Sequence, residues 1–257
     1  MMSAPWSLAF LTSRWDATRA VTLGLVGGYV DTVGYIMLRG LFPNHVTGNL
    51  PIAAARWGTE AIPLLIMVPL WLVAVVLSAG AAGWMERRRG APALPTVLAG
   101  EAVLLGLFLA LGVALVPDRD SSTLLTQTIV GAAGVCAMGV QSVVTRLGGY
   151  VFPTTMVTGT LTLLGMDCAQ AAFRLGPESE SAATVHRIKA FSRVVVAFAV
   201  GAALGGVMTA VIEFWAIALP VVLVALCARG ELTAGSQRPR FAKQGGRRSP
   251  VRNEGAS

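Results

Sequence analysis

The chain is poor in the residues that carry chemistry in most enzymes. Only 13% of its 257 residues are charged, and it has two histidines and three cysteines. The sequence contains no His-x-x-Glu-His zinc pattern, no Gly-x-Ser-x-Gly elbow and no Gly-x-x-x-x-Gly-Lys phosphate loop. Cys136, Cys168 and Cys227 lie far apart in apolar runs, so we expect buried free thiols. The sequence therefore predicts no enzyme, no cofactor and no metal site.

What the chain has in abundance is apolar surface. Apolar residues make up 54% of it, glycine is frequent, and the mean hydropathy is +0.68. Runs of roughly 20 apolar residues cross a bilayer core, and in lipid they must be helical because their backbone groups have no other partner. The composition predicts an all-α integral membrane protein. Six segments are long enough to span: 20–39, 62–85, 94–116, 122–145, 189–209 and 213–229.

The two ends of the chain differ from this apolar part. The first 18 residues lack both a long apolar core and a small-residue cleavage site, so we expect no cleaved signal peptide. The last stretch has more Lys and Arg than Glu, with Gly, Pro and Ser between them, and is expected to lie against anionic lipid rather than nucleic acid. The expected units are an N-terminal cytoplasmic arm, two membrane repeats and a basic disordered cytoplasmic tail (1–18, 19–117, 118–230 and 231–257).

Two polar interruptions resemble each other. FPNHVTGNLPIAAA begins at Phe42, and FPTTMVTGTLTLL begins at Phe152. One shift along the chain superposes Val46–Leu50 on Val157–Leu161 and also Gly28 on Gly139. This pattern predicts a tandem duplication, in which each half has a spanning helix, a Thr-Gly segment and two more spanning helices.

The positions of the basic residues favour Thr-Gly segments that enter the membrane and return to the same side. With both segments re-entrant and the N-terminus inside, only Arg39, Arg56 and Arg119 lie outside. If both segments cross, Arg87–Arg89 and Arg146 move outside as well, against the positive-inside rule. Three spans per half give inverted repeats, which are typical of secondary transporters. Eight crossing helices and parallel repeats are the alternative.

A re-entrant first segment would place a helix start at the membrane midplane. Phe42–Thr47, if extended, is long enough to reach that depth. Thr47 or Asn49 is then a good N-cap, Pro51 fits the first turn, and Leu50–Trp57 forms a half-helix. Its unpaired N–H groups and positive dipole end attract polar solutes. The alternative is that Thr and Gly only let helices approach closely.

Asp31 lies near the middle of the first span, where a charge is costly and marks either substrate or proton handling or a structural hydrogen bond. Its counterpart in the second half is Ser142, next to Gln141. His45, Glu101 and Asp167 are less distinctive. The substrate-binding residues predicted from these patterns are Asp31, Thr47, Gly48, Asn49, Gln141, Ser142, Thr158, Gly159 and Thr160.

The segments GGYVDTVGYIMLRGLFPNHVTGNL and MGVQSVVTRLGGYVFPTTMVTGTLTLLG closely resemble the bacterial YoaK family of membrane proteins, a domain of unknown function. The resemblance covers nearly all of residues 19–229. It implies a polytopic, mostly six-helix protein of the bacterial inner membrane, with no established substrate. The matching positions are Gly28, Asp31, Gly34, Thr47, Gly48, Asn49, Gln141, Pro153, Thr158 and Gly159.

These patterns together favour a small-solute transporter or permease, with a channel as a close variant. Its site would lie between the two Thr-Gly segments, with Asp31 as the coupling or binding carboxylate. The expected partners are the lipid bilayer, anionic lipid at the tail and a small-molecule or ion substrate. A non-transporting membrane scaffold or assembly protein is the second hypothesis, in which the Thr-Gly turns serve packing alone.

Overall fold

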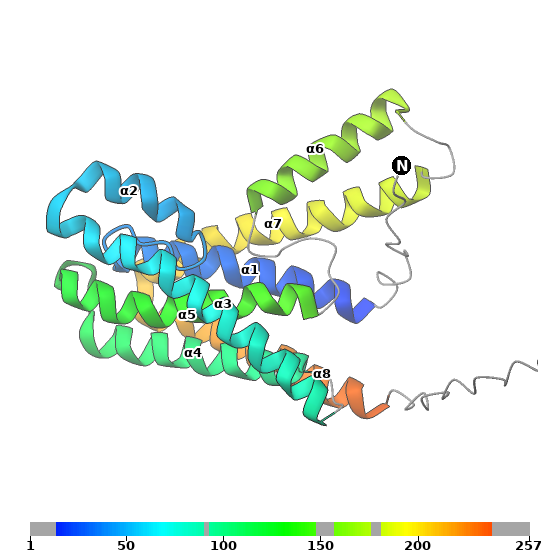
Figure 1. Cartoon of the computed structure of the whole chain (residues 1–257). Helices are drawn as coiled ribbons and strands as arrows, with labels where there is room; N and C mark the ends of the chain where they lie inside the picture. Colours follow the sequence, from blue (N-terminus) through cyan, green and yellow to red (C-terminus); the bar gives the residue numbers. More distant parts are fainter. Residues whose placement is uncertain (1–13, 90–92, 148–156, 176–180, 238–257) are drawn as a thin grey trace, which may run out of the picture.

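The computed structural model describes residues 14–89, 93–147, 157–175 and 181–237 (Figure 1). These residues are helical and contain no strand, so the predicted all-α class is confirmed for them. The α-helices are α1 (Arg14–Met37), α2 (Asn49–Arg56), α3 (Ile62–Arg89), α4 (Leu94–Leu115), α5 (Leu124–Leu147), α6 (Val157–Phe173), α7 (Ser181–Ile212) and α8 (Ala218–Gln237). Short 3-10 helices are η2 (Val46–Gly48), η3 (Gly58–Ala61), η4 (Arg119–Ser121) and η6 (Glu213–Ile217).

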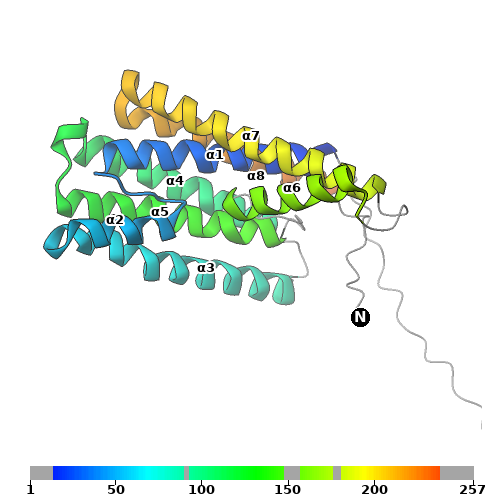
Figure 2. The ribbon, with the colours of Figure 1, turned by 90° about the horizontal axis from the view of Figure 1, so that it is seen from above.

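The long helices α1, α3, α4, α5, α7 and α8 follow the predicted spanning segments and run along a common direction (Figures 1 and 2). Five stretches of the described chain are long and apolar enough to cross a membrane, and the fifth, Ser181–Thr233, contains both α7 and α8. These stretches indicate a membrane protein. Some helices extend beyond the predicted bounds, because helical hydrogen bonds continue into polar residues after the apolar run has ended.

Glycine contacts establish which helices run parallel. A side chain at Gly24 would meet Val194, and one at Gly28 would lie 2.2 Å from the Phe198 carbonyl oxygen. Further along, Gly205 lies against the backbone of Tyr29. Residue numbers increase in the same direction along the two helices at these contacts, so α1 and α7 are parallel. Glycine at positions 24 and 28 allows the two backbones to come this close, because it has no side chain.

Two glutamines of α5 join it to α1 in the opposite sense. Gln141 Nε2 donates to the Leu23 carbonyl over 3.0 Å, and Gln127 Nε2 donates to the Leu38 carbonyl over 2.9 Å. The later glutamine meets the earlier part of α1, so the two helices are antiparallel. Interhelical hydrogen bonds of this kind also hold a bundle together in lipid, where apolar burial gives little preference between partners.

Helix α5 packs on α3 through glycines as well. A side chain at Gly131 would meet Leu41 and Met67, and one at Gly139 would meet Trp71 and Ala74. Because Gly131 precedes Gly139 as Met67 precedes Trp71, α3 and α5 are parallel. It follows that α1 and α3 are antiparallel, as their colours in Figure 1 also show.

The chain between α1 and α3 returns to the end of the bundle that it left. The Arg56 guanidinium, at the end of α2, donates to the carbonyl oxygen of Arg39, which follows α1. The Arg39 side chain pairs with Glu60, just before α3, over 3.3 Å. Residues 40–56 therefore descend beside α1 and come back, because both arms of the segment meet at one place.

The three cysteines are free, as predicted, but their burial differs. Cys227 is buried and Cys136 half-buried, whereas Cys168 is exposed on α6. The expectation that Cys168 is buried is therefore wrong, because α6 packs mainly on α7 and leaves its other faces uncovered. Helix α8 continues to Gln237, into the stretch assigned to the tail. The predicted match at Pro153, most of the N-terminal arm and the rest of the tail lie outside the described residues.

Candidate functional site

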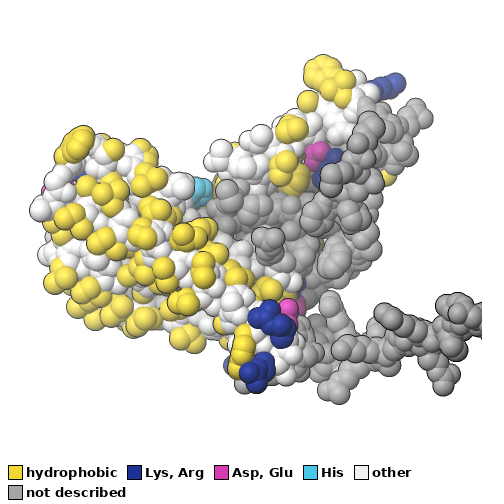
Figure 3. Space-filling model, viewed as in Figure 1, with side chains coloured by type: hydrophobic (Ala, Val, Ile, Leu, Met, Phe, Trp, Pro, Cys, Tyr) yellow, Lys and Arg dark blue, Asp and Glu magenta, His cyan; other side chains and the backbone are white. Residues whose placement is uncertain are grey.

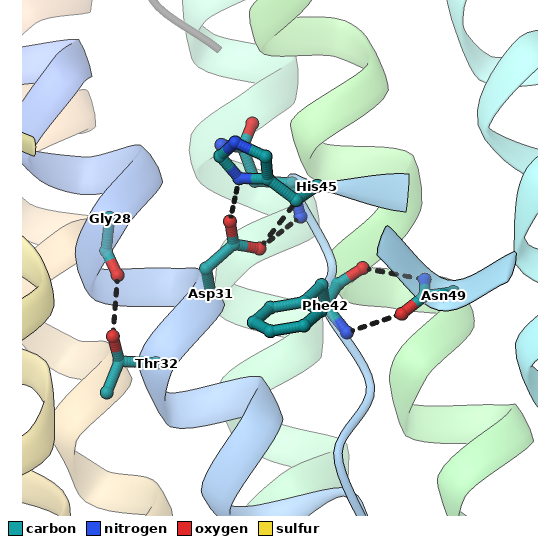
Figure 4. A network of polar contacts seen from close by, with 7 residues as sticks. Gly28, Asp31, Thr32, Phe42, His45 and Asn49 are labelled. Carbon is teal, nitrogen blue, oxygen red and sulfur yellow. Dashed lines mark hydrogen bonds and ion pairs between the residues drawn. The ribbon is translucent and has the colours of Figure 1, made fainter. Parts of the chain in front are cut away.

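Asp31 holds the deep end of the first Thr-Gly segment. Its Oδ1 accepts the backbone N–H groups of Asn44 over 2.7 Å and His45 over 3.2 Å, and its Oδ2 lies 2.5 Å from His45 Nδ1 (Figure 4). Asp31 is only 4% exposed. It lies eight residues before Arg39, about 12 Å along the helix axis at 1.5 Å per residue. The segment therefore runs about 12 Å along α1 before it turns, a length comparable to half the thickness of a bilayer core.

A glycine makes room for the descending chain. A side chain at Gly34 would lie 2.5 Å from the Pro43 ring and 3.0 Å from the Leu41 carbonyl. Without a Cβ at this position, the non-helical stretch before His45 lies directly on the surface of α1. Because of this close approach, the N–H groups of Asn44 and His45 lie within hydrogen-bond distance of Asp31, which is one helical turn before Gly34 on α1.

The electrostatics of the pair follow from its donors. A buried carboxylate is stable only with hydrogen bonds or a positive charge nearby, and Asp31 receives two backbone N–H groups as well as the imidazole. The His45 side chain is 31% exposed, so it connects the buried carboxylate with the protein surface. His45 is thus the member of the pair that is accessible at the protein surface.

Asn49 has a structural partner. Its Oδ1 accepts the Phe42 N–H over 2.8 Å, and its Nδ2 donates to the Phe42 carbonyl over 2.9 Å (Figure 4). Asn49 is fully buried. The paired bonds fasten the descending arm of the segment to the start of α2.

The prediction that Thr47 or Asn49 caps the half-helix is wrong. Gly48 occupies the N-cap of α2 without a side-chain hydrogen bond, and the 3-10 turn η2 precedes it from Val46. The Asn49 side chain instead bonds the Phe42 backbone, and the Gly48 N–H donates to the His45 carbonyl within the 3-10 turn. The half-helix has the predicted length of eight residues, but it runs from Asn49 to Arg56, one residue earlier than the predicted Leu50–Trp57, with Pro51 in its first turn.

Other polar groups surround this pair. A side chain added at Gly27 would lie within 4 Å of the side-chain amide groups of Asn44 and Gln141. Gln141 is fully buried, and its Oε1 accepts no hydrogen bond from the described residues. The hydroxyl of Ser142 donates to the Met138 carbonyl within α5. Gln141 thus belongs to the buried polar layer near Asp31, whereas this bond of Ser142 stays within its own helix.

The second Thr-Gly segment forms a different structure. Val157–Gly159 begins α6, which has 17 residues rather than eight. Thr160 is buried, whereas Thr158 and Gly159 are exposed, and no atom lies within 4 Å of a side chain placed at Gly159. In the first segment Thr47 is exposed and Gly48 half-buried. Each motif therefore presents its threonine at the surface.

An ion pair fixes α6 to α7. The Arg187 guanidinium donates through Nε and Nη2 to the Asp167 carboxylate, with a shortest distance of 2.7 Å, and also donates to Thr184 Oγ1. Asp167 is 7% exposed. This two-nitrogen geometry is among the stronger arrangements of an arginine and a carboxylate. Asp167 therefore anchors α6, rather than lying free along a path.

The surface is hollowed between the part of the molecule that carries α2 and the part that carries α6, and a histidine side chain is visible there (Figure 3). The His45 ring meets Phe198 of α7 edge-on, with ring centroids 5.4 Å apart. Among the described residues, no group of three His, Cys, Asp or Glu side chains is arranged to hold a metal ion. The geometry is that of a small polar site beside an aromatic ring.

The comparison with protein families can now be added to this geometry. The sequence model of a family described as a protein of unknown function (DUF1275) matches residues 19–229. The chain belongs to this family. The match covers all of the long helices apart from their outermost ends, and it agrees with the resemblance seen in the Val-Thr-Gly motifs. No curated protein and no solved structure matches the DUF1275 chain significantly.

Two residues of this site were missing from the predicted set. The sequence marks His45 as a less distinctive candidate for substrate binding than Asp31, and it does not mark Asn44 at all. The signal for His45 was its position one residue before the Val-Thr-Gly motif, where a turn at the depth of Asp31 brings it to the carboxylate. Asn44 contributes a backbone N–H, which any residue except proline has, so its identity gave no signal.

Proposed function

We propose that this DUF1275 protein is a small-solute transporter or permease of the bacterial inner membrane. Six helices would span the bilayer as two inverted halves, while α2 and α6 enter from opposite faces and return. Support comes from the first segment, whose two ends meet at Arg39 and Arg56. The antiparallel arrangement of α1 and α5 also favours halves of opposite orientation.

Equivalent glycines further support two related halves. Gly28 on α1 packs against the backbone of Phe198 in α7, and Gly139 on α5 packs against the backbone of Trp71 in α3. The first helix of each half thus contacts the second long helix of the other half through the glycine that the sequence repeat superposes. This reciprocal exchange is what a two-fold axis in the membrane plane would produce.

The solute would bind where the starts of α2 and α6 approach the same part of α7. Asp167 pairs with Arg187 and Leu164 packs near Phe191, so α6 runs antiparallel to α7. Continued to the start of α6, this register brings Val157 level with Phe198, the residue that the His45 ring contacts. Two helix N-termini near one point at mid-depth offer N–H groups to a polar or anionic solute.

Within this site the residues have separate roles. His45 and Thr47 in the first segment and Thr158 in the second reach the surface and would contact the solute. Asp31 would act through His45, since its carboxylate is buried and already accepts three hydrogen bonds. The observation that carries the proposal is this Asp31–His45 pair, buried at one end and accessible at the other.

Ligand binding by the purified protein tests the proposal. A panel of small polar solutes is screened for an increase in the melting temperature, because a solute that binds only the folded state stabilises it. We expect at least one solute to stabilise the native protein and to lose its effect in His45→Asn and Thr47→Val. The matched controls are His186→Asn and Thr59→Val, whose side chains are exposed elsewhere. That solute should also cross vesicles containing the protein. Equal shifts in variants and controls, or no flux, contradict the proposal.

A second function is a non-transporting scaffold or assembly protein. It is favoured by the number of polar groups that the chain itself uses, since Asp31 and Asn49 both fasten the first segment. The two functions differ in which substitutions matter. If the cellular phenotype survives His45→Asn and Thr47→Val but not Gly201→Ala, whose side chain would lie 2.0 Å from the Leu25 carbonyl, packing is the essential property.

The remaining assignments belong to the same proposal. Both termini would be cytoplasmic, with the basic tail beside anionic lipid, because this orientation leaves few basic residues outside. The scarcity of histidine and the lack of a catalytic motif favour a protein that moves a solute over an enzyme that converts one. A channel would differ from a permease in showing flux that does not saturate with solute concentration.

A further inference from the structure

A second buried acid lies outside the site described above. Glu101, on α4, is fully buried, as are its neighbours one turn away on either side, Leu98 and Leu105. Neither carboxyl oxygen of Glu101 has a hydrogen-bond partner among the described residues. A carboxyl group in this position is unusual, because buried polar groups in native proteins are nearly always paired.

The other acids within the helices show how a charged carboxylate is accommodated in this fold. Asp31 accepts three hydrogen bonds, and Asp167 faces two nitrogens of Arg187. Glu101 has no such donors in the described part of the chain. The free-energy cost of a buried ion without partners is several kcal/mol at least, and a group in this situation takes up a proton instead.

The charged groups around Glu101 are few. The α5 stretch 124–145, which packs on α4, has no acidic, basic or histidine residue. On α8, Glu231 is engaged by Arg19 of α1 in a buried ion pair, while Glu101 and Arg19 both act electrostatically on the Cys227 thiol. The remaining charged groups on these elements are the exposed Arg229 of α8, Glu213 of η6 and the exposed α3 charges Glu86, Arg87 and Arg88. No described cation is paired with Glu101 itself.

We propose that Glu101 is a proton-binding site, protonated in this conformation and able to release its proton while the protein stays folded. Asp31 and Glu101 then differ as their surroundings do: Asp31 accepts three hydrogen bonds, whereas Glu101, which accepts none from the described residues, is the neutral carboxylic acid. Such a division between two carboxyl groups follows from their environments alone. The inference does not depend on solute transport, so either proposal can fail without the other.

Infrared spectroscopy of the purified protein tests the site directly. A protonated carboxyl group gives a C=O stretching band apart from that of carboxylates, and the band shifts in D2O. At neutral pH we expect this band in the native protein and in Asp31→Asn, and its loss in Glu101→Gln, which is nearly the same size. Raising the pH should remove the band reversibly before the helical signal is lost.

Three results would overturn the proposal. The first is that the native protein lacks the band at neutral pH. The second is that Glu101→Gln leaves the band unchanged. The third is that the band persists to the highest pH at which the protein is folded. The first and third use only the native protein, so they decide the question even if Glu101→Gln does not fold. An unchanged band in Glu101→Gln would assign the proton to another acid.

Discussion

The same three residues begin two different structures in this protein. Val46-Thr47-Gly48 forms the 3-10 turn before an eight-residue helix, whereas Val157-Thr158-Gly159 is the first turn of a helix of 17 residues. The first motif is held at its deep end by Asp31. The second belongs to a helix that is held further along by the ion pair between Asp167 and Arg187. A repeated motif therefore fixes where a helix starts, and residues outside the motif decide how the helix is anchored.

The difference has a physical basis in the neighbouring residues. Trp57 has a positive φ of 44°, and α2 ends there after Arg56 has bonded the Arg39 carbonyl. In the second half, α6 continues past the equivalent point, and its residue Asp167 meets Arg187 of α7. The first segment is thus tied at both ends and cannot lengthen, whereas the second is free to extend along α7.

The largest effect should come from removing the anchor of the first segment. Asp31→Leu leaves the N–H groups of Asn44 and His45 and the imidazole without their acceptor, which should cost about 3–5 kcal/mol of stability. Asp31→Asn is the matched control, because its amide oxygen can still accept both N–H groups. Melting in detergent should show a large loss for leucine and a small one for asparagine. Similar losses for the two would mean that charge, rather than acceptance by Oδ1, holds the segment.

The anchor of the second segment should matter less for the whole protein and more for α6. Asp167→Ala removes the partner of Arg187, whose side chain is 28% exposed and keeps some hydration, so we expect a loss of roughly 1–3 kcal/mol. Hydrogen exchange should become faster in α6 and stay unchanged in α2. Faster exchange in both helices would show that the two segments are coupled, against the separate anchoring described here.

Loosening the two arms of the first segment is expected to have a moderate effect. Asn49→Ala removes both hydrogen bonds to Phe42 and should destabilise the protein by about 1–2 kcal/mol. Asn49→Asp retains the acceptor for the Phe42 N–H but loses the donor to its carbonyl, so it should not restore the native melting temperature. Native stability in Asn49→Ala would show that Asp31 alone holds the segment.

The smallest effect compares the two motif glycines directly. A methyl group at Gly48 would lie 3.3 Å from the Phe42 ring, whereas one at Gly159 would meet nothing within 4 Å. Gly159→Ala should raise stability by up to about 1 kcal/mol, since alanine favours helix. Gly48→Ala should gain less or lose stability because the ring must shift. Equal gains at both positions, measured by melting, would contradict the different packing of the two motifs.

Much of the fold follows from apolar runs and glycines, because a spanning helix needs only length and hydropathy. The eight-residue half-helix was also predictable, since Pro43, Pro51 and Trp57 bound a short segment. The roles of the polar residues in this segment could not be predicted from the sequence. Asn49 looks like an N-cap in the sequence, but its side chain bonds the Phe42 backbone, and Asp31 on α1 holds Asn44 and His45 before the motif. Local patterns contain no information about that approach. The length of α6 was equally inaccessible, because it depends on packing against α7.

Cysteine labelling of the two segments tests the inverted arrangement most directly. In a background with Cys136, Cys168 and Cys227 replaced by serine, single cysteines are placed at the exposed positions Arg39, Thr59 and Arg174. A membrane-impermeant maleimide is applied to intact and to opened cells. The account predicts that Arg39→Cys and Thr59→Cys label from one face and Arg174→Cys from the other. Labelling of Arg39→Cys and Thr59→Cys from opposite faces would show that the first segment crosses the membrane, and the account would be wrong.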